Sequence, residues 1–160
     1  MGYLKFTPIF QERVWGARNL SAKLGKDIPE GKIGESWEMV DRPEANSVVA
    51  EGPKAGQTLR ELIKADPEAI MGPGWKSEDA FPILVKWLDC EERLSLQVHP
   101  PAEVADQLGG EPKTENWYIA DCRPGAQLLA GLNPGVTKEA FAEALEANQL
   151  EPLVCALPTQ

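Results

Sequence analysis

Short apolar segments, separated by proline and glycine, predict strands rather than long helices along most of this chain. Residues 81–89 are almost continuously apolar, which is typical of a strand that is buried on both faces of a sheet. Residues 94–99 alternate between apolar and polar side chains, as in a strand with one buried face. Two further strands are predicted at residues 114–120 and 126–132.

Two helices are predicted from their first turns. Thr58 is followed three residues later by Glu61, which is a capping-box pattern, and the helix that begins there should end before Pro67. Thr137 is a candidate N-cap for a second, amphipathic helix. The apolar side of this helix consists of Ala140, Phe141, Ala144 and Leu145.

The order of these elements favours an antiparallel β architecture. Residues 35–40 and 46–50 lie on either side of a turn-rich segment and predict a β-hairpin. Strands outnumber helices, and they do not alternate with helices as they do in a parallel sheet. No linker, repeat or low-complexity tract divides the sequence, so we expect residues 1–160 to form a single, mainly β domain with a few helices.

Composition limits the classes of partner. The 160 residues carry a formal net charge of −9, which argues against nucleic acid or an anionic membrane surface, because both need a basic footprint. No apolar run approaches the roughly 18 residues of a membrane span, and no signal peptide is recognisable. The three cysteines are more than thirty residues apart, which predicts reduced thiols in a cytoplasmic protein. A small anionic ligand remains compatible with the charge.

The candidate chemistry lies around the one histidine of the chain, His99. In the predicted strand 94–99, alternation places Leu94, Leu96 and Val98 toward the core and Ser95, Gln97 and His99 on the opposite face. Two prolines follow His99 and should end the strand at the rim of a sheet.

The next predicted strand adds two charged residues to this region. Lys113 and Glu115 are two residues apart and should therefore share a face. A glutamine carbonyl, a neutral imidazole and a carboxylate form an acceptable ligand set for zinc or another first-row divalent ion. The same residues would also suit a solvated, hydrogen-bonded surface, so residue types alone leave both interpretations open.

The motifs "LSLQVHP" and "PKTENWY" resemble the signature of the type I phosphomannose isomerases, zinc enzymes of the cupin fold. In that family, a strand ending in Gln-Val-His-Pro is followed by a short helix and then by Gly-Lys-Thr-Glu-x-Trp-Tyr. The resemblance extends outwards in the same order through "VWGARNL", "IGESWEM" and "GQTLRELI". Pro112 departs from the usual glycine, which puts only the shape of that loop in doubt.

The resemblance implies roles for five residues and a reaction. Gln97, His99 and Glu115 correspond to zinc ligands, while Ser95 and Lys113 correspond to residues that line the sugar-phosphate pocket. The implied fold is a cupin or jelly-roll, a β-sandwich or barrel, incomplete at its C-terminus. The implied reaction is the interconversion of mannose 6-phosphate and fructose 6-phosphate. Three other motif residues, Trp15, Glu35 and Trp37, are expected to belong to the core and framework.

The family also has a fourth zinc ligand, a histidine in a later strand, and a catalytic arginine beyond it. His99 is the only histidine here, so we expect the fourth ligand of the single zinc ion beyond residue 160 and interpret the chain as the N-terminal part of the catalytic domain. A shortened, non-catalytic metal- or sugar-binding cupin module, a site completed by a second copy and a purely structural β-domain remain as alternatives. An open sheet edge would favour a homodimer.

Overall fold

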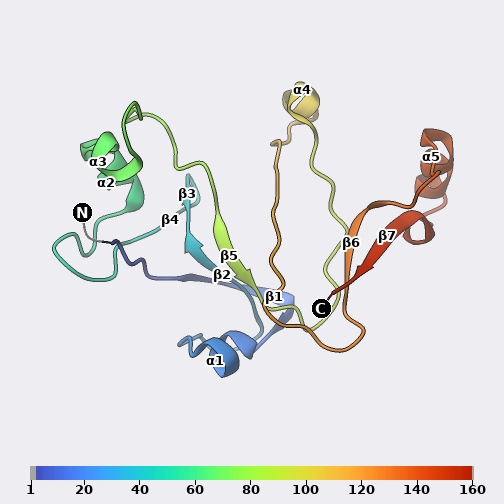
Figure 1. Ribbon diagram of the computed structural model, residues 1–160, viewed down its shortest axis with the longest axis horizontal. Coiled ribbons are helices and arrows are strands. Elements are labelled where there is room, and N and C mark those ends of the chain that lie inside the picture. The colour runs from blue at the N-terminus through green and yellow to red at the C-terminus, as the bar shows by residue number, and fades with distance from the viewer. Residues whose placement is uncertain (1–2, 160) are drawn as a thin grey trace. The chain divides into compact units, whose positions relative to one another are not determined.

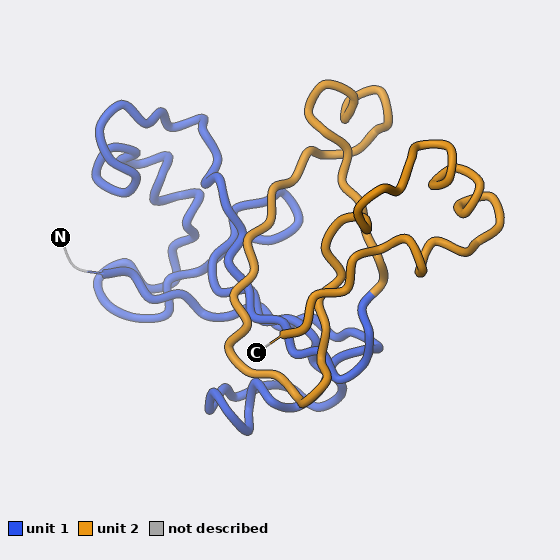
Figure 2. The backbone as a smooth tube through the Cα atoms, turned by 45° about the vertical axis from the view of Figure 1, so that its right-hand side comes forward, with its two compact units in different colours: residues 1–94 blue, residues 95–160 orange. Residues whose placement is uncertain are grey.

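The computed structural model describes residues 3–159. Its contacts divide the chain into two compact units, Met1–Leu94 and Ser95–Gln160 (Figure 2). Strands in each unit pair only in antiparallel fashion, and the helices are short. The mainly β fold class with a few helices is therefore confirmed, and the described residues contain no closed barrel.

A three-stranded sheet organises the first unit, in the order β1 (Ile9–Ala17), β2 (Ile33–Met39) and β5 (Val85–Leu88) (Figure 1). The central strand β2 pairs Ile9 with Trp37 on one side and Leu88 with Glu35 on the other. Residues 35–40 were predicted to form a hairpin with residues 46–50, and only the end next to the turn does so, where the backbone nitrogen of Ser47 donates to the carbonyl oxygen of Val40 at 2.9 Å. Strand β2 finds its partners in β1 and β5 instead.

The turn-rich segment between the two predicted hairpin strands does form a hairpin, but a much smaller one. It consists of β3 (Asp41–Arg42) and β4 (Ala45–Asn46), which pair with each other alone. Val48 and Val49, which were predicted to extend the hairpin, instead make isolated bridges to Thr58 and Phe6.

Strand β1 leaves the ladder where it crosses β2. Glu12 and Ala17 both pair with Ile33, so the four residues between them bulge out of register. The crossing is too close for side chains, because a Cβ atom on Gly16 would lie 2.5 Å from the backbone nitrogen of Gly34. A Cβ atom on Gly34 would in turn lie 2.6 Å from the Cβ of Arg13. Glycine is therefore needed on both strands.

Three helices accompany this sheet: α1 (Asn19–Leu24), α2 (Leu59–Ala65) and α3 (Pro67–Met71). The capping box at Thr58 and Glu61 is present, and α2 ends before Pro67, so both predictions are confirmed. Helix α1 has no capping side chain at its own N-cap. Instead Asp89, which follows β5, accepts hydrogen bonds from the backbone nitrogens of Asn19 at 2.6 Å and Leu20 at 3.1 Å.

The core of the first unit is built from the apolar sides of these elements. Leu62 and Ile63 of α2 are at most 1% exposed, as their helical spacing predicted, and Val40 is fully buried beside β2. A second cluster joins Leu20 and Ile28 to Ile33, with Phe10 packed against it.

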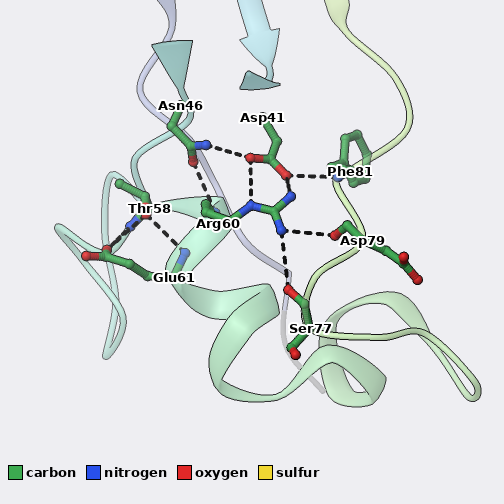
Figure 3. A network of polar contacts seen from close by, with 8 residues as sticks. All are labelled: Asp41, Asn46, Thr58, Arg60, Glu61, Ser77, Asp79 and Phe81. Carbon is green, nitrogen blue, oxygen red and sulfur yellow. Dashed lines mark hydrogen bonds and ion pairs between the residues drawn. The ribbon is translucent and has the colours of Figure 1, made fainter. Parts of the chain in front are cut away.

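A polar network connects the hairpin to α2 and to the segment before β5 (Figure 3). The carboxylate of Asp41 pairs with the guanidinium of Arg60 through two nitrogens. It also accepts hydrogen bonds from Asn46 Nδ2 at 2.7 Å and from the backbone nitrogen of Phe81 at 2.8 Å. Arg60 donates further to the carbonyl oxygens of Ser77 and Asp79.

The second unit contains one β-hairpin and short helical segments. Strands β6 (Gln127–Leu132) and β7 (Val154–Pro158) pair, and the chain between them forms α5 (Lys138–Glu146). The hydroxyl of Thr137 accepts from the backbone nitrogen of Ala140, which confirms the predicted N-cap. The remaining elements are α4 (Ala102–Ala105) and two 3-10 turns, Asp106–Leu108 and Glu151–Leu153.

Three predicted strands differ from the structure. The apolar run 81–89 contributes only the four residues of β5, an edge strand with Val85 and Trp87 exposed rather than buried. Residues 94–99 and 114–120 form no strand. Alternation describes which side chains could share a face, but a strand also needs a hydrogen-bonded neighbour, and no described strand pairs with either segment.

No helix within residues 3–159 combines the length and apolar character that crossing a bilayer would require.

Candidate metal and sugar-phosphate site

The five residues singled out in the sequence all belong to the second unit. They lie on two extended segments of the chain, one before and one after α4. Helix α4 connects these segments at the far end of the long loop that they form (Figure 1). The apolar side chains expected to anchor the first segment do not do so, because Leu96 is 47% exposed and Val98 is 84% exposed. The prediction that His99 ends a strand at a sheet rim is therefore wrong, although two prolines do follow it.

Contacts between side chains nevertheless bring the two segments together. The ammonium nitrogen of Lys113 lies 3.3 Å from Nε2 of His99 and 2.9 Å from Oε1 of Glu115. The side chains of Lys113 and Glu115 are 40% and 38% exposed. The imidazole of His99 and the carboxylate of Glu115 thus converge on the positive charge of Lys113, although His99 is 14 residues and Glu115 two residues away from it in sequence.

Ser95 and Gln97 form the second contact of the site. Nε2 of Gln97 donates a hydrogen bond to the hydroxyl oxygen of Ser95, at 3.0 Å. Their side chains therefore lie on a common side, as the spacing of two residues predicted. The bond uses the amide nitrogen of Gln97 and not its carbonyl oxygen, which is the atom that could bind a metal.

The residues fit a divalent metal ion in donor type. One carbonyl oxygen, one imidazole nitrogen and one carboxylate oxygen suit zinc and its neighbours. Nε2 of His99 and Oε1 of Glu115 both contact the same cation in the structure, the ammonium group of Lys113. Among residues 3–159, no group of three or more histidine, cysteine, aspartate or glutamate side chains could hold a metal. The candidate set has two such residues and depends on Gln97 for its third ligand.

A buried carboxylate in the first unit forms a polar centre that the sequence pattern did not predict. Glu35 of β2 is 6% exposed and accepts hydrogen bonds from Nε of Arg13 at 3.0 Å and Nε1 of Trp37 at 2.6 Å. Lys86 of β5 lies 3.3 Å from the same carboxylate. Burial alone would raise the pKa of Glu35, but the Trp37 hydrogen bond and the charges of Lys86 and Arg13 lower it overall.

The partners of Glu35 come from three strands, which places this centre within the framework of the sheet. Trp37, two residues away, could be anticipated as a same-face neighbour. Arg13 and Lys86 lie 22 and 51 residues away, and only the strand order β1-β2-β5 brings them to Glu35. The expectation that Glu35 and Trp37 belong to the framework agrees with this arrangement.

Comparison with known proteins gives the family of the chain. Residues 3–139 match the family described as phosphomannose isomerase type I, catalytic domain. The chain belongs to this family. The match contains both halves of the candidate site, and isomerases of this family are metal-dependent.

Individual mannose-6-phosphate isomerases are similar to nearly the whole chain. The probable mannose-6-phosphate isomerase GmuF of Bacillus subtilis (strain 168) is 40% identical over 149 residues, which are 92% of this chain and 46% of the relative. Mannose-6-phosphate isomerase ManA of the same organism is 38% identical, over 94% of this chain and 47% of the relative. The chain therefore spans about half the length of the curated relatives that it matches.

A solved structure shows that the fold is shared as well. The crystal structure of the mannose 6-phosphate isomerase from Bacillus subtilis superimposes with a TM-score of 0.86 at 34% identity. It covers 98% of this chain, and this chain covers 49% of it. The present chain thus has the fold of about half of that isomerase.

Proposed function

We propose that this chain carries part of the active site of a metal-dependent aldose–ketose isomerase, which interconverts mannose 6-phosphate and fructose 6-phosphate. Family membership supports the reaction class. The observation that carries the site assignment is the convergence of His99 and Glu115 on the Lys113 ammonium. The proposal treats residues 1–160 as the N-terminal part of a cupin-type catalytic domain.

Three residues are proposed as metal ligands. Gln97 would contribute its carbonyl oxygen, His99 its Nε2 nitrogen and Glu115 its Oε1 oxygen. Zinc is the proposed ion, and when bound it would supply a Lewis acid that polarises the sugar carbonyl. Because His99 is the only histidine, a fourth ligand of that type would have to come from outside residues 1–160.

Ser95 and Lys113 are proposed to bind the sugar phosphate. The hydroxyl of Ser95 can donate to a substrate oxygen while it accepts from Gln97. The ammonium of Lys113 supplies positive charge for the phosphate or for the negative charge that develops on the sugar oxygens as a proton moves between C1 and C2. In a chain with a net charge of −9, local cations of this kind are needed to hold an anionic substrate.

The proposal is tested by measuring zinc content and the interconversion of the two sugar phosphates in the same purified samples. His99→Ala and Gln97→Ala should lose zinc, and the activity should fall with it. Gln107→Ala is the matched control, because Gln107 is an exposed glutamine of the same unit with no assigned role. Both measurements are made on the longer isomerase of which we propose that this chain is the N-terminal part, because the fourth ligand is expected outside residues 1–160. Stoichiometric zinc with no turnover in that unmutated enzyme would favour the non-catalytic binding module instead.

A further inference from the structure

The position of Lys113 raises a question about how a metal ion could enter the site. Its ammonium contacts both His99 Nε2 and Glu115 Oε1, two of the three proposed ligand atoms. An ammonium group has only donors, so a neutral imidazole can accept from Lys113 only through the lone pair of Nε2, with the ring hydrogen on Nδ1. This is the same tautomer and the same lone pair that a metal ion would use.

The two cations exclude each other at this pair of atoms. Metal bonds to imidazole nitrogen and carboxylate oxygen are about 2.0 to 2.2 Å long. The ammonium nitrogen lies 3.3 Å and 2.9 Å from the same atoms. A metal ion that draws both ligands to bonding distance would occupy the space between them, so the ammonium has to leave.

Lys113 can leave without disturbing the backbone. Its side chain is 40% exposed and carries the charge on a flexible four-carbon stem, so it can turn into solvent while its backbone stays in place. Glu115, at 38% exposure, is equally free of tight packing. The contact is therefore an ion pair that can exchange rather than a buried structural pair.

We infer that Lys113 and the divalent metal ion exchange at His99 and Glu115, so that metal binding releases the Lys113 ammonium for an anionic ligand. Lys113 acts here as a positioning residue that holds the two ligands near each other until the metal takes its place. The inference rests on the proposed function for its ligand assignment and gives the site an order of binding, with the metal first and the sugar phosphate second.

The first test measures zinc affinity of the chain, after chelation and buffer exchange, by competition with a fluorescent zinc indicator. Lys113→Met should bind zinc about two- to fivefold more tightly than the unmutated chain, which corresponds to the loss of one exposed competing ion pair. Lys32→Met is the control, because Lys32 forms an ion pair of the same length, 2.9 Å, with Glu92 in the first unit. Equal or weaker binding by Lys113→Met would overturn the inference, as would the absence of zinc binding by both chains.

The second test separates exchange from simple charge repulsion. Acylation of individual lysines by an amine-specific reagent is followed by mass spectrometry, with and without saturating zinc. Exchange predicts faster acylation of Lys113 in zinc, because the amine loses both of its contacts, whereas Lys32 should react at an unchanged rate. A Lys113 rate that does not rise would refute the exchange.

The outcomes also distinguish this inference from the proposed function. If His99→Ala weakens zinc binding but Lys113→Met leaves it unchanged, the ligand assignment stands and only the exchange fails. If His99→Ala binds zinc as the unmutated chain does, the ligand assignment itself fails.

Discussion

The network around Asp41 gives the most quantitative prediction for stability. Asp41→Asn keeps the size of the side chain but removes the charge that pairs with Arg60. The new amide nitrogen would also face donors, since Arg60 and the backbone nitrogen of Phe81 both donate to the carboxylate. The variant therefore leaves a guanidinium without its counter-ion and sets donor against donor (Figure 3).

The expected loss follows from the burial of the pair. Breaking a fully buried ion pair by removing one partner costs about 3 to 5 kcal/mol. Here the Asp41 side chain is 5% exposed and that of Arg60 is 21% exposed, so water can partly solvate the orphaned guanidinium. Arg60 also keeps its hydrogen bonds to the carbonyls of Ser77 and Asp79. We expect Asp41→Asn to lower the free energy of unfolding by about 2 to 3 kcal/mol.

The assay is urea unfolding followed by tryptophan fluorescence, because four of the five tryptophans lie in the first unit. Glu51→Gln is the control, since its ion pair with Lys5 is solvent-exposed and 3.4 Å long, and should change stability by about 0.5 kcal/mol or less. A double-mutant cycle with Arg60→Met should give a coupling energy of about 1 to 3 kcal/mol between the two residues. The reasoning would be refuted if the stability losses of the two single variants simply added up in the double variant. It would also be refuted if Asp41→Asn lost no more stability than Glu51→Gln.

Three further predictions concern the first unit. The pKa of Asp41 is lowered, because the Arg60 pair and the hydrogen bonds from Phe81 and Asn46 outweigh burial, which alone would raise it; the pKa of Glu35 is lowered too. The stabilising effect of each carboxylate is therefore full above its ordinary pKa, 3.8 for Asp41 and 4.5 for Glu35, and is lost as the pH falls through its lower folded-state pKa. Because Asp41→Asn removes only the first of these, below about pH 3.8 its free energy of unfolding should depend less steeply on pH than that of the unmutated chain. Thr58→Ala removes the capping box of α2 and should cost about 1 kcal/mol in urea unfolding, whereas an unchanged midpoint would show that the cap is dispensable. Gly34→Ala should destabilise by about 2 kcal/mol or more because its Cβ meets Arg13 at 2.6 Å, and a variant as stable as the unmutated chain would contradict the close crossing of β1 and β2.

Local signals in the sequence predicted local structure well. The capping residues Thr58 and Thr137 each bond to a backbone nitrogen three residues later, so the whole interaction lies within one short stretch of sequence. The pairs Ser95–Gln97 and Lys113–Glu115 have the same advantage, since two residues of spacing are enough to bring their side chains into contact.

Strand pairing could not be predicted in the same way. Residues 94–99 alternate as a strand does, but alternation contains no information about a hydrogen-bonded neighbour, and none pairs with them among the described strands. Strand β2 was assigned the nearest partner in sequence, although its actual partners β1 and β5 lie farther away along the chain. Apolar character at residues 81–89 likewise predicted burial on both faces, whereas β5 has a single neighbouring strand.

The polar networks show the same limit. Asp41 and Arg60 are 19 residues apart, and Asp89 caps a helix that begins 70 residues earlier. Nothing in the residue types marks such partners, because any acidic and basic pair could have met. For the candidate site, the contact between His99 and Lys113 crosses 14 residues, and only the resemblance to the isomerase family gave a reason to place the two motif halves together.

The measurement that tests the central claim most directly is zinc stoichiometry of the purified protein and of its His99→Ala variant, with isomerisation of mannose 6-phosphate recorded on the same samples. Made on the longer isomerase of which we propose that this chain is the N-terminal part, the measurement should show zinc in the unmutated enzyme. His99→Ala should lose both zinc and activity, while Gln107→Ala keeps both. Zinc content in His99→Ala equal to that of the unmutated protein would contradict the assignment of Gln97, His99 and Glu115 as the metal ligands.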